Sequence, residues 1–339
     1  MDKSDYLSKK LEAVEVIPRS VSELLAAMGK TGFQGRKLAE VLDVLTAMAS
    51  DPNCTIFMGY AGSMSTTGQW KIVHWLIENR YVDVLVSTGA NITEDVFEAM
   101  GNSYYQGSHV VDDKDLLDHQ IDRYYDVYAD ELQYRMMENL LGEFMMTLDP
   151  SERYSSADFL YRFGEYQNAQ GINSITAAAQ RAGVPVFSPA MADSGFGVAY
   201  YQFAKKRGLK VAVDQFKDFE QMGDIGDKAT STAVIYVGGG VPKDTIQLIT
   251  VIVGLIRGGG QVCPHKYAIQ ITTDSPQWGG LSGCTFEEAI SWGKIDEKAA
   301  KAVLYSDATI ALPLLSHGLD ERLRGKKRIG PDLSWVFKK

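Results

Sequence analysis

Two periods of hydrophobic and polar positions alternate along the chain. Short apolar runs, typical of buried strands, cover residues 55–60, 82–87, 184–188, 211–214, 233–237, 267–272 and 303–307. Between most of these runs, apolar residues recur at the spacing of an amphipathic helix, most clearly over residues 33–48. Successive strand–turn–helix units predict a parallel sheet with right-handed crossovers. We therefore expect an α/β fold with a doubly wound, mostly parallel sheet and helices on both faces.

The alternation is interrupted once. Residues 101–160 are rich in tyrosine, aspartate and methionine and include a long helix over about residues 129–148, so we interpret them as a helical insertion that packs on the sheet or on a partner subunit. Residues 1–32 are expected to form an N-terminal extension with one helix around residues 21–28. Residues 33–323 are expected to form a single domain, and residues 324–339 a basic, exposed tail.

Composition limits the classes of protein. The chain has 339 residues, 45% of them hydrophobic, and a net charge of −9, which argues against nonspecific nucleic-acid binding and suits a small cationic substrate. Three cysteines without CxxC spacing and five histidines without HxxH spacing predict a reducing compartment and no metal site. No apolar run reaches the ~20 residues that cross a bilayer, and the N-terminus lacks the apolar region of a signal peptide. A cytoplasmic location without membrane partners is expected.

The stretch from Trp278 to Lys294 is the strongest candidate for chemistry. It begins as a glycine-rich loop and continues as a helix with Thr285 as N-cap and Glu288 three residues later, the spacing of a capping box. The helix brings Glu288, Trp292 and Lys294 together. A lysine beside an indole and a carboxylate can be partly desolvated, which favours the neutral, nucleophilic amine. Lys294 is therefore a candidate covalent nucleophile; the alternative is an ordinary surface lysine just past a helix.

Small and polar residues follow several of the predicted strands. Ligands of open α/β sheets bind beyond the carboxyl ends of the strands. The run 238–240 of three glycines is a candidate pyrophosphate contact, because glycine permits close backbone approach and a helix N-terminus supplies amide donors; the alternative is a tight turn from strand to helix. Ser63, Thr66 and Thr88 are candidate ligand contacts or simple helix caps. Asp307 is a candidate for binding a ribose or a cation, or a turn aspartate.

These residues carry a resemblance to the deoxyhypusine synthase family over about residues 30–318. The Ser-Trp-Gly-Lys motif that ends at Lys294 is its most specific element. The other matching segments are residues 59–68, 83–88, 94–95, 186–190 with Asp193, 237–241, 288–291 and 305–307. The resemblance implies a Rossmann-like fold, NAD as cofactor, and a homotetramer whose active sites lie between paired subunits.

The resemblance also implies roles for single residues. Lys294 falls on the family's imine-forming lysine, and Glu288 and Trp292 fall on positions that contact the polyamine. In the implied reaction an aminobutyl group passes from spermidine to the lysine and then to an acceptor amine. The residues expected to bind NAD are Ser63, Thr66, Thr88, Glu94, Asp193, Gly238, Gly239, Gly240, Thr273 and Asp307.

The chain departs from the family pattern at several of its functional positions. Asp244 stands where the family has a catalytic histidine, and we take it as the candidate replacement. Val198 and Leu281 stand where the family has acidic residues that anchor the polyamine, and Trp278 stands at a cofactor-binding aspartate. Since a buried ammonium without its partner costs several kcal/mol, we expect an altered amine substrate.

Three functions are compatible with these residues. The leading prediction is an NAD-dependent transferase of aminobutyl-type groups that acts on small amines, as homospermidine synthases do; the retained Glu288, Trp292 and Lys294 favour it. The first alternative is a true deoxyhypusine synthase that modifies a lysine of a translation factor. The second is a catalytically silent NAD-binding oligomeric scaffold, which the missing histidine favours.

Overall fold

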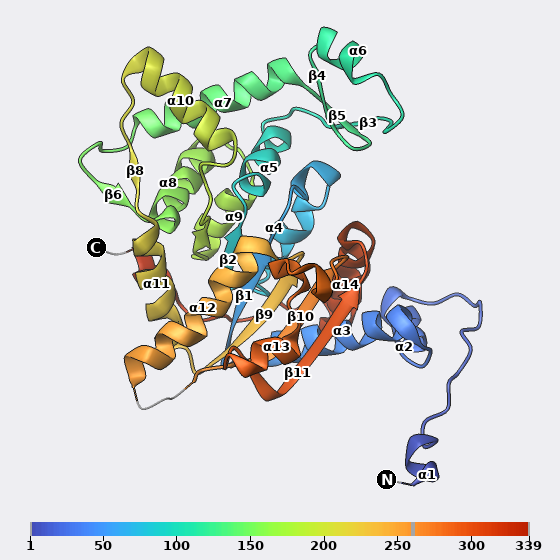
Figure 1. Cartoon of the computed structure of the whole chain (residues 1–339). Coiled ribbons are helices and arrows are strands. Elements are labelled where there is room, and N and C mark those ends of the chain that lie inside the picture. The colour runs from blue at the N-terminus through green and yellow to red at the C-terminus, as the bar shows by residue number, and fades with distance from the viewer. Residues whose placement is uncertain (1, 259–261, 338–339) are drawn as a thin grey trace.

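A six-stranded parallel sheet forms the centre of the computed structural model, which describes residues 2–258 and 262–337 (Figure 1). The strand order is β11-β10-β9-β1-β2-β7, and all of the strand pairs in this sheet are parallel. The strands are β1 (Cys54–Tyr60), β2 (Val84–Ser87), β7 (Val186–Phe187), β9 (Ser231–Val237), β10 (His265–Thr272) and β11 (Ile295–Tyr305). The predicted α/β class and parallel sheet are confirmed.

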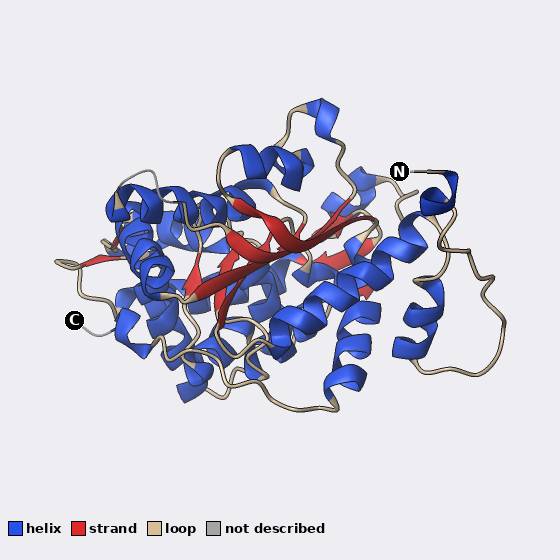
Figure 2. Cartoon of the chain, turned by 90° about the horizontal axis from the view of Figure 1, so that it is seen from below, coloured by secondary structure: helices blue, strands red, loops and turns tan. Residues whose placement is uncertain are grey.

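Helices cover both faces of the sheet, as Figure 2 shows. Successive residues of a strand point to opposite faces, so Ile56 and Met58 enter one hydrophobic cluster while Phe57 enters another. The first cluster includes residues of α3 (Phe33–Ser50), α4 (Trp70–Glu78) and α14 (Ala308–Leu323), and the second includes residues of α11 (Gln215–Lys228), α12 (Gly240–Arg257) and α13 (Phe286–Ser291). The doubly wound arrangement is therefore also confirmed.

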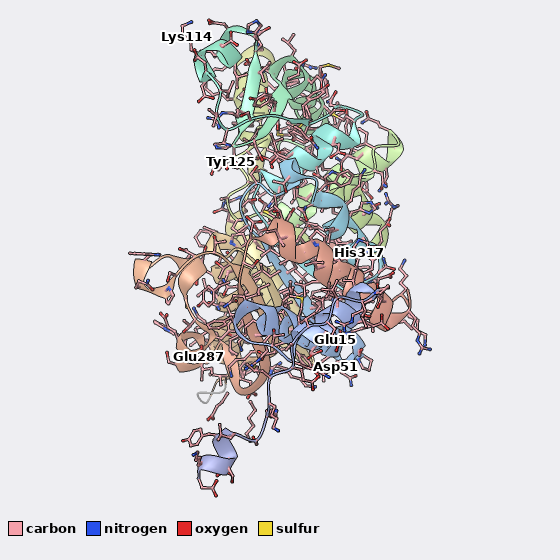
Figure 3. The ribbon with its side chains drawn as sticks, turned by 90° about the vertical axis from the view of Figure 1, so that its right-hand side faces the viewer. Glu15, Asp51, Lys114, Tyr125, Glu287 and His317 are labelled. Atoms are coloured by element: carbon pink, nitrogen blue, oxygen red, sulfur yellow. The ribbon has the colours of Figure 1, made fainter. Side chains whose placement is uncertain are left out.

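The segment from residue 101 to 160 contains a small antiparallel sheet of its own. Its strands are β3 (Tyr105–Gln106), β4 (Ile121–Tyr124) and β5 (Val127–Asp130), followed by α7 (Glu131–Met146), which is the long helix predicted over residues 129–148. Figure 3 shows Lys114 and Tyr125 of this unit at one end of the molecule and Glu287 of α13 toward the other.

One predicted strand lies outside the main sheet. The apolar run 211–214 contains only β8 (Ala212–Val213), which pairs with β6 (Arg153–Tyr154) in a separate two-stranded sheet. Ala212 is exposed and Val213 is half-buried, so this run lacks the burial that is typical of a central strand. The expectation that it continues the strand–helix alternation of the main sheet is wrong.

The remaining helices connect these elements. They are α1 (Lys3–Tyr6), α2 (Val21–Met28), α5 (Asn91–Ala99), α6 (Asp113–Asp118), α8 (Ser156–Ala169), α9 (Ile175–Ala182) and α10 (Gly195–Arg207). The helix predicted over residues 21–28 is α2, which packs on α3 and α14 and buries Leu25, whereas α1 stands away from the body (Figure 1). Within the described residues, none of the helices combines the length and the hydropathy needed to span a bilayer.

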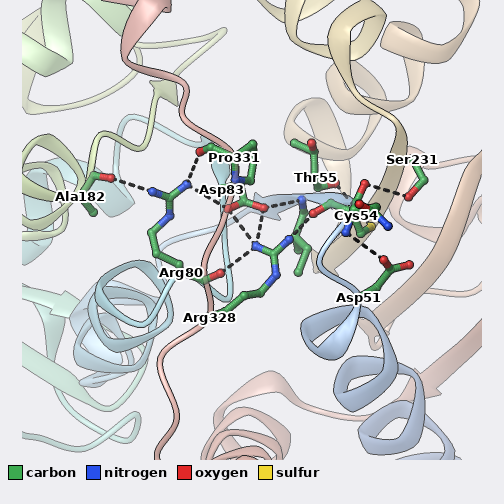
Figure 4. A network of polar contacts seen from close by, with 11 residues as sticks. Asp51, Cys54, Thr55, Arg80, Asp83, Ala182, Ser231, Arg328 and Pro331 are labelled. Carbon is green, nitrogen blue, oxygen red and sulfur yellow. Dashed lines mark hydrogen bonds and ion pairs between the residues drawn. The ribbon is translucent and has the colours of Figure 1, made fainter.

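Part of the C-terminal segment is docked on the body of the protein. The Arg328 side chain is 5% exposed and its Nη1 donates to both carboxylate oxygens of Asp83, at 3.0 and 2.8 Å (Figure 4). Leu333 and Val336 enter the hydrophobic core. Asp83 is fully buried just before β2, and a buried carboxylate needs a cationic partner. The expectation of an exposed basic tail agrees with residues 324–327, which are exposed, and is wrong for Arg328, Leu333 and Val336, because Arg328 supplies that cation.

Candidate active site

The strand order of the sheet reverses at β1, the position at which open α/β sheets have their ligand-binding crevice. β1 lies between β2 and β9. The chain continues from β1 to β2 on one side of this point and from β9 to β10 on the other, and in such folds the space at the carboxyl ends of the two central strands is where a ligand binds. The turns that follow β1 and β9 meet here. The Ala61 backbone N–H donates to the Val237 carbonyl at 3.1 Å, and a Cβ on Gly238 would lie 3.3 Å from the Ala61 Cβ. This is the position at which ligands bind in open α/β sheets.

All ten residues expected to bind NAD follow the carboxyl ends of strands of the main sheet. Asp193 and Thr273 are exposed there. Ser63 and Thr66 follow β1, Thr88 and Glu94 follow β2, Asp193 follows β7, Gly238, Gly239 and Gly240 follow β9, Thr273 follows β10, and Asp307 follows β11. The fold thus places them along one edge of the sheet, while their contact with the cofactor stays a prediction.

Glu94 carries a buried acceptor without a partner. Ser63 Oγ donates to Glu94 Oε1 at 2.6 Å, whereas Oε2 has no hydrogen-bond partner among the described residues. Burial raises the pKa of this carboxyl to about 7, although the Ser63 hydrogen bond lowers it. Buried polar atoms normally have partners, and an acidic residue at such a crevice can accept a ribose hydroxyl. Glu94 therefore fits a nucleotide ligand such as NAD.

The hydroxyls of two further candidates are tied to the turn itself. Thr66 Oγ1 donates to the Ser63 carbonyl at 2.9 Å, and Thr88 Oγ1 donates to the Gly62 carbonyl at 2.7 Å. Asp307 caps α14 by accepting from the Thr309 backbone N–H at 2.7 Å. These contacts support the local, turn-forming interpretation of the three residues and leave lone pairs on their oxygens for a ligand.

The glycine turn packs closely against the loop that follows β10. Gly238 and Gly240 have φ of 71° and 55°, the left-handed region that favours glycine. A Cβ on Gly239 would lie 2.4 Å from the Ser282 Cα, and the Gly240 N–H donates to Ser282 Oγ at 3.1 Å. The tight-turn alternative therefore accounts for the three glycines, and a pyrophosphate contact stays a prediction.

Lys294 points into a cavity of about 300 Å³ between α12 and α13. Its Nζ lies 3.6 Å from Asp244 Oδ1 and 5.4 Å from the ring centre of Trp292. The Lys294 side chain is 12% exposed and that of Asp244 34%. Glu288 lines the same cavity, with Gln247, Pro276, Gly279, Gly280, Leu281, Cys284 and Ala289. The four residues proposed for catalysis and substrate binding are thus brought together.

Local sequence explains how Lys294 reaches this place. Thr285 caps α13 by accepting from the Glu288 backbone N–H at 3.1 Å, as predicted. Trp292 ends the helix, and Gly293, with φ of 68°, turns the chain so that Lys294 lies directly before β11, within 3.6 Å of Asp244 on α12. The Asp244 carboxylate is close enough to exchange a proton with this amine during a reaction, and an unprotonated lysine amine is a nucleophile.

Sequence reasoning missed the buried lysine behind this cavity. Lys243 is 1% exposed, and its Nζ donates to the Cys284 carbonyl at 2.6 Å and to Gln270 Oε1 at 3.0 Å. Burial lowers the pKa of Lys243 to about 8. The sequence hint that could have identified Lys243 is its position directly before Asp244, in a helix that starts at the glycine turn. Its burial could not be predicted, because its partners are distant in sequence.

A second cavity, of about 410 Å³, adjoins Glu94 and Val198. Asp122 and Glu138 also line it, and burial raises the pKa of both carboxyls. Glu138 is paired with Arg135 at 2.5 Å. The acidic group that the family pattern places at residue 198 is therefore absent, yet two carboxylates from β4 and α7 face the same space. Neither was identified from the sequence.

Comparison with known proteins identifies the family of this chain. The sequence profile of the family described as "Deoxyhypusine synthase" matches residues 23–319. "Probable deoxyhypusine synthase 2" of Methanosarcina mazei is 45% identical over 95% of this chain and 93% of its own length, and the protein of the same name from Archaeoglobus fulgidus is 49% identical over 86% and 95%.

Among solved structures, the fold resembles that of a "putative deoxyhypusine synthase" from Entamoeba histolytica, with a TM-score of 0.65, 18% sequence identity, and coverage of 92% of this chain and 96% of that one. At this identity the likeness supports the fold alone. The profile match includes the sheet turns and Lys294, and the relatives from Methanosarcina mazei and Archaeoglobus fulgidus cover 95% and 86% of the chain. The chain belongs to the deoxyhypusine synthase family.

Proposed function

We propose that this protein transfers an aminobutyl-type group from a polyamine-like donor to an amine acceptor through an imine at Lys294, with NAD as cofactor. The observation that carries the proposal is the Lys294 amine in a small cavity, 3.6 Å from the Asp244 carboxylate and beside Glu288 and Trp292. Membership of the family supports aminobutyl transfer in general.

The residues of the cavity divide the chemical work. Asp244 accepts a proton from Lys294, and the neutral amine then attacks the imine carbon of the oxidised donor, from which a small amine leaves. Glu288 pairs with an ammonium of the substrate and Trp292 offers its ring face to the same charge. When bound, NAD supplies the acceptor and later the donor of a hydride. Ser63, the free oxygen of Glu94 and the glycine turn would hold it at the crevice.

An altered, small-molecule amine substrate is part of the proposal. Leu281 adds an apolar wall to the Lys294 cavity, and Val198 does the same at the Glu94 cavity. Asp122 and Glu138 line that cavity beside Arg123 and Arg135, so an ammonium would meet a charge pattern different from that of the family. A different spacing of charges selects an amine of different length. The homospermidine-synthase-like activity is therefore favoured over modification of a protein lysine.

The proposal includes a homotetramer with active sites between paired subunits. The Lys294 cavity is formed by α12, α13 and the loop before α13, whereas the Glu94 cavity is formed by α5, α7, α10 and β4, and the two share no lining residue. A two-fold partner would bring one cavity of each kind together. A cytoplasmic location is retained as the expectation from composition.

Trapping of the imine tests the proposal. The protein is incubated with NAD and spermidine, putrescine or agmatine, reduced with borohydride, and digested for mass spectrometry. We expect an added aminoalkyl mass on Lys294 and release of a smaller amine. Lys294→Arg should abolish the adduct, while Lys298→Arg, at an exposed position on β11, should leave it unchanged.

Two outcomes would count against the proposal. Absence of an adduct with every amine, with no difference between the unmodified protein and Lys294→Arg, leaves the NAD-binding scaffold as the better account. If an adduct forms but is transferred only to a lysine of an added translation factor, the protein is a true deoxyhypusine synthase. Transfer to free putrescine supports the small-molecule reaction.

A further inference from the structure

A buried lysine stands directly behind the cavity that holds Lys294. Lys243, in the first turns of α12, donates its Nζ hydrogens to the Cys284 carbonyl at 2.6 Å and to Gln270 Oε1 at 3.0 Å. Its Nζ also lies 5.7 Å from the ring centre of Tyr236 on β9. Lysine is almost never fully buried without polar partners. The chain thus keeps a charged group inside the wall of its candidate active site, and its partners are neutral.

Gln270 extends these contacts to the glycine turn. Its Nε2 donates to the Gly238 carbonyl and to the Ser282 carbonyl, both at 2.8 Å. Ser282 Oγ in turn accepts from the Gly240 N–H at 3.1 Å. The side chains of Lys243 and Gln270 therefore join three segments: the start of α12, the glycine turn, and the loop that leads into α13.

Besides the Tyr236 ring, four ionisable groups lie close enough to the Lys243 ammonium to change its pKa. Burial is the largest effect and lowers the pKa of Lys243 to about 8. Cys284, Glu288 and Asp244 favour its charged form, and Lys294 disfavours it. The charge of Lys243 thus changes within a pH range in which the folded protein can be studied.

We propose that Lys243 is a positioning residue for Lys294. It holds the carbonyl of Cys284, the residue before the N-cap Thr285, and so fixes the start of the helix that carries Lys294 to Asp244. If Lys243 is replaced by an apolar residue, two acceptors lose their donor and the loop is released from α12. Loss of the charge alone leaves two weaker, neutral hydrogen bonds. The catalytic meaning of this role rests on the proposed transferase function, but the placement of the Lys294 amine can be measured without turnover.

Chemical labelling of Lys294 provides that measurement. The folded protein is reductively methylated with formaldehyde and cyanoborohydride over a pH series around 8, and the extent at each lysine is read by mass spectrometry. We expect an inflection in the Lys294 rate near pH 8, where Lys243 loses its charge. Lys243→Met should remove the inflection and change the Lys294 rate about tenfold. Lys266→Met, at a surface lysine paired with Asp51, should preserve both.

A second variant keeps the test decisive if Lys243→Met does not fold. Gln270→Glu places a carboxylate beside the ammonium, which favours the charged form of Lys243 and should move the inflection to higher pH. An inflection that stays near pH 8 in Gln270→Glu, or a folded Lys243→Met with the labelling profile of the unmodified protein, overturns the proposal.

Substrate trapping then links the positioning role to function. Lys243→Met should raise the amine concentration for half-maximal trapping about tenfold or more. It should leave NAD affinity within about twofold, because Gln270 still holds the glycine turn. If the unmodified protein traps no amine, the transferase proposal fails, and the labelling experiment still decides the role of Lys243.

Discussion

Arg328 is expected to stabilise the fold through its buried contacts with Asp83 and the backbone around it. Its guanidinium donates to both oxygens of Asp83, to the Arg80 carbonyl at 3.0 Å and to the Cys54 carbonyl. Asp83 is fully buried, and burial raises the pKa of its carboxyl in spite of both arginines. Arg328→Met leaves this carboxylate with Arg80 at 3.1 Å and the Ile56 N–H at 2.9 Å.

The expected loss of stability depends on the partners that Asp83 keeps in this variant. Removing one partner of a buried ion pair typically costs 3–5 kcal/mol, and because Arg80 stays, we expect a loss of about 3 kcal/mol for Arg328→Met. Asp83→Asn combined with Arg328→Met should recover part of this loss, since no unpaired charge is left. Protonated Asp83 needs no cation, so the difference from the unmodified protein should shrink as the pH falls through the raised pKa of Asp83.

Equilibrium unfolding in urea at one fixed protein concentration measures this effect, because assembly of subunits would make the midpoint depend on concentration. Lys327→Met is the matched control, since Lys327 is the exposed neighbour of Arg328 in sequence. If Arg328→Met and Lys327→Met unfold at the same urea concentration, the buried pair contributes nothing net and the reasoning is refuted.

Three further predictions concern the candidate site. Glu94→Gln should raise the free energy of unfolding by roughly 3 kcal/mol at pH 8 and leave it unchanged below pH 4.5, because the stability that a carboxyl with a raised pKa of about 7 contributes at low pH is lost as the pH rises. Urea titrations at both pH values check this, and equal stability of the two proteins at pH 8 contradicts it. Gly239→Ala should lower the free energy of unfolding by about 1–3 kcal/mol, because the added Cβ would meet the Ser282 backbone, whereas Gly32→Ala, whose Cβ would have nothing within 4 Å, should not lower it. Equal melting temperatures of the two variants would disprove the packing argument. Asp244→Asn should slow adduct formation on Lys294 about 100-fold at neutral pH and recover at alkaline pH; an unchanged pH profile would show that the carboxylate accepts no proton.

The parallel sheet could be predicted from sequence because its central strands are continuous apolar runs. The run 233–237 is buried over its whole length as part of β9, and the same holds for β1. β11 was only partly predicted, since its first half carries Asp296, Glu297 and Lys298 and reads as a polar loop. An edge strand has one side free of neighbours, so its sequence lacks the apolar signal of a central strand.

In the candidate site too, contacts between residues close in sequence could be predicted, and contacts between distant residues could not. Glu288, Trp292 and Lys294 lie within one short helix and its end, so their proximity follows from local geometry. The partners of Lys243 come from β10 and from the loop before α13, and this contact exists only after the sheet has formed. The docking of residue 328 on residue 83 is likewise a tertiary event, which a run of basic residues at a chain end does not reveal.

The position of β11 at the margin of the sheet has a consequence for how copies of this chain can associate. An exposed strand edge is a template for further strands and therefore a hazard for aggregation. Charged side chains at Asp296, Glu297 and Lys298 fall where the pairing of β10 with β11 is irregular, between the His265–Ile295 pair and the Tyr267–Ala300 pair. Desolvating these charges disfavours continuation of the sheet into a neighbouring molecule. These charges therefore disfavour edge-to-edge pairing at this margin of the sheet.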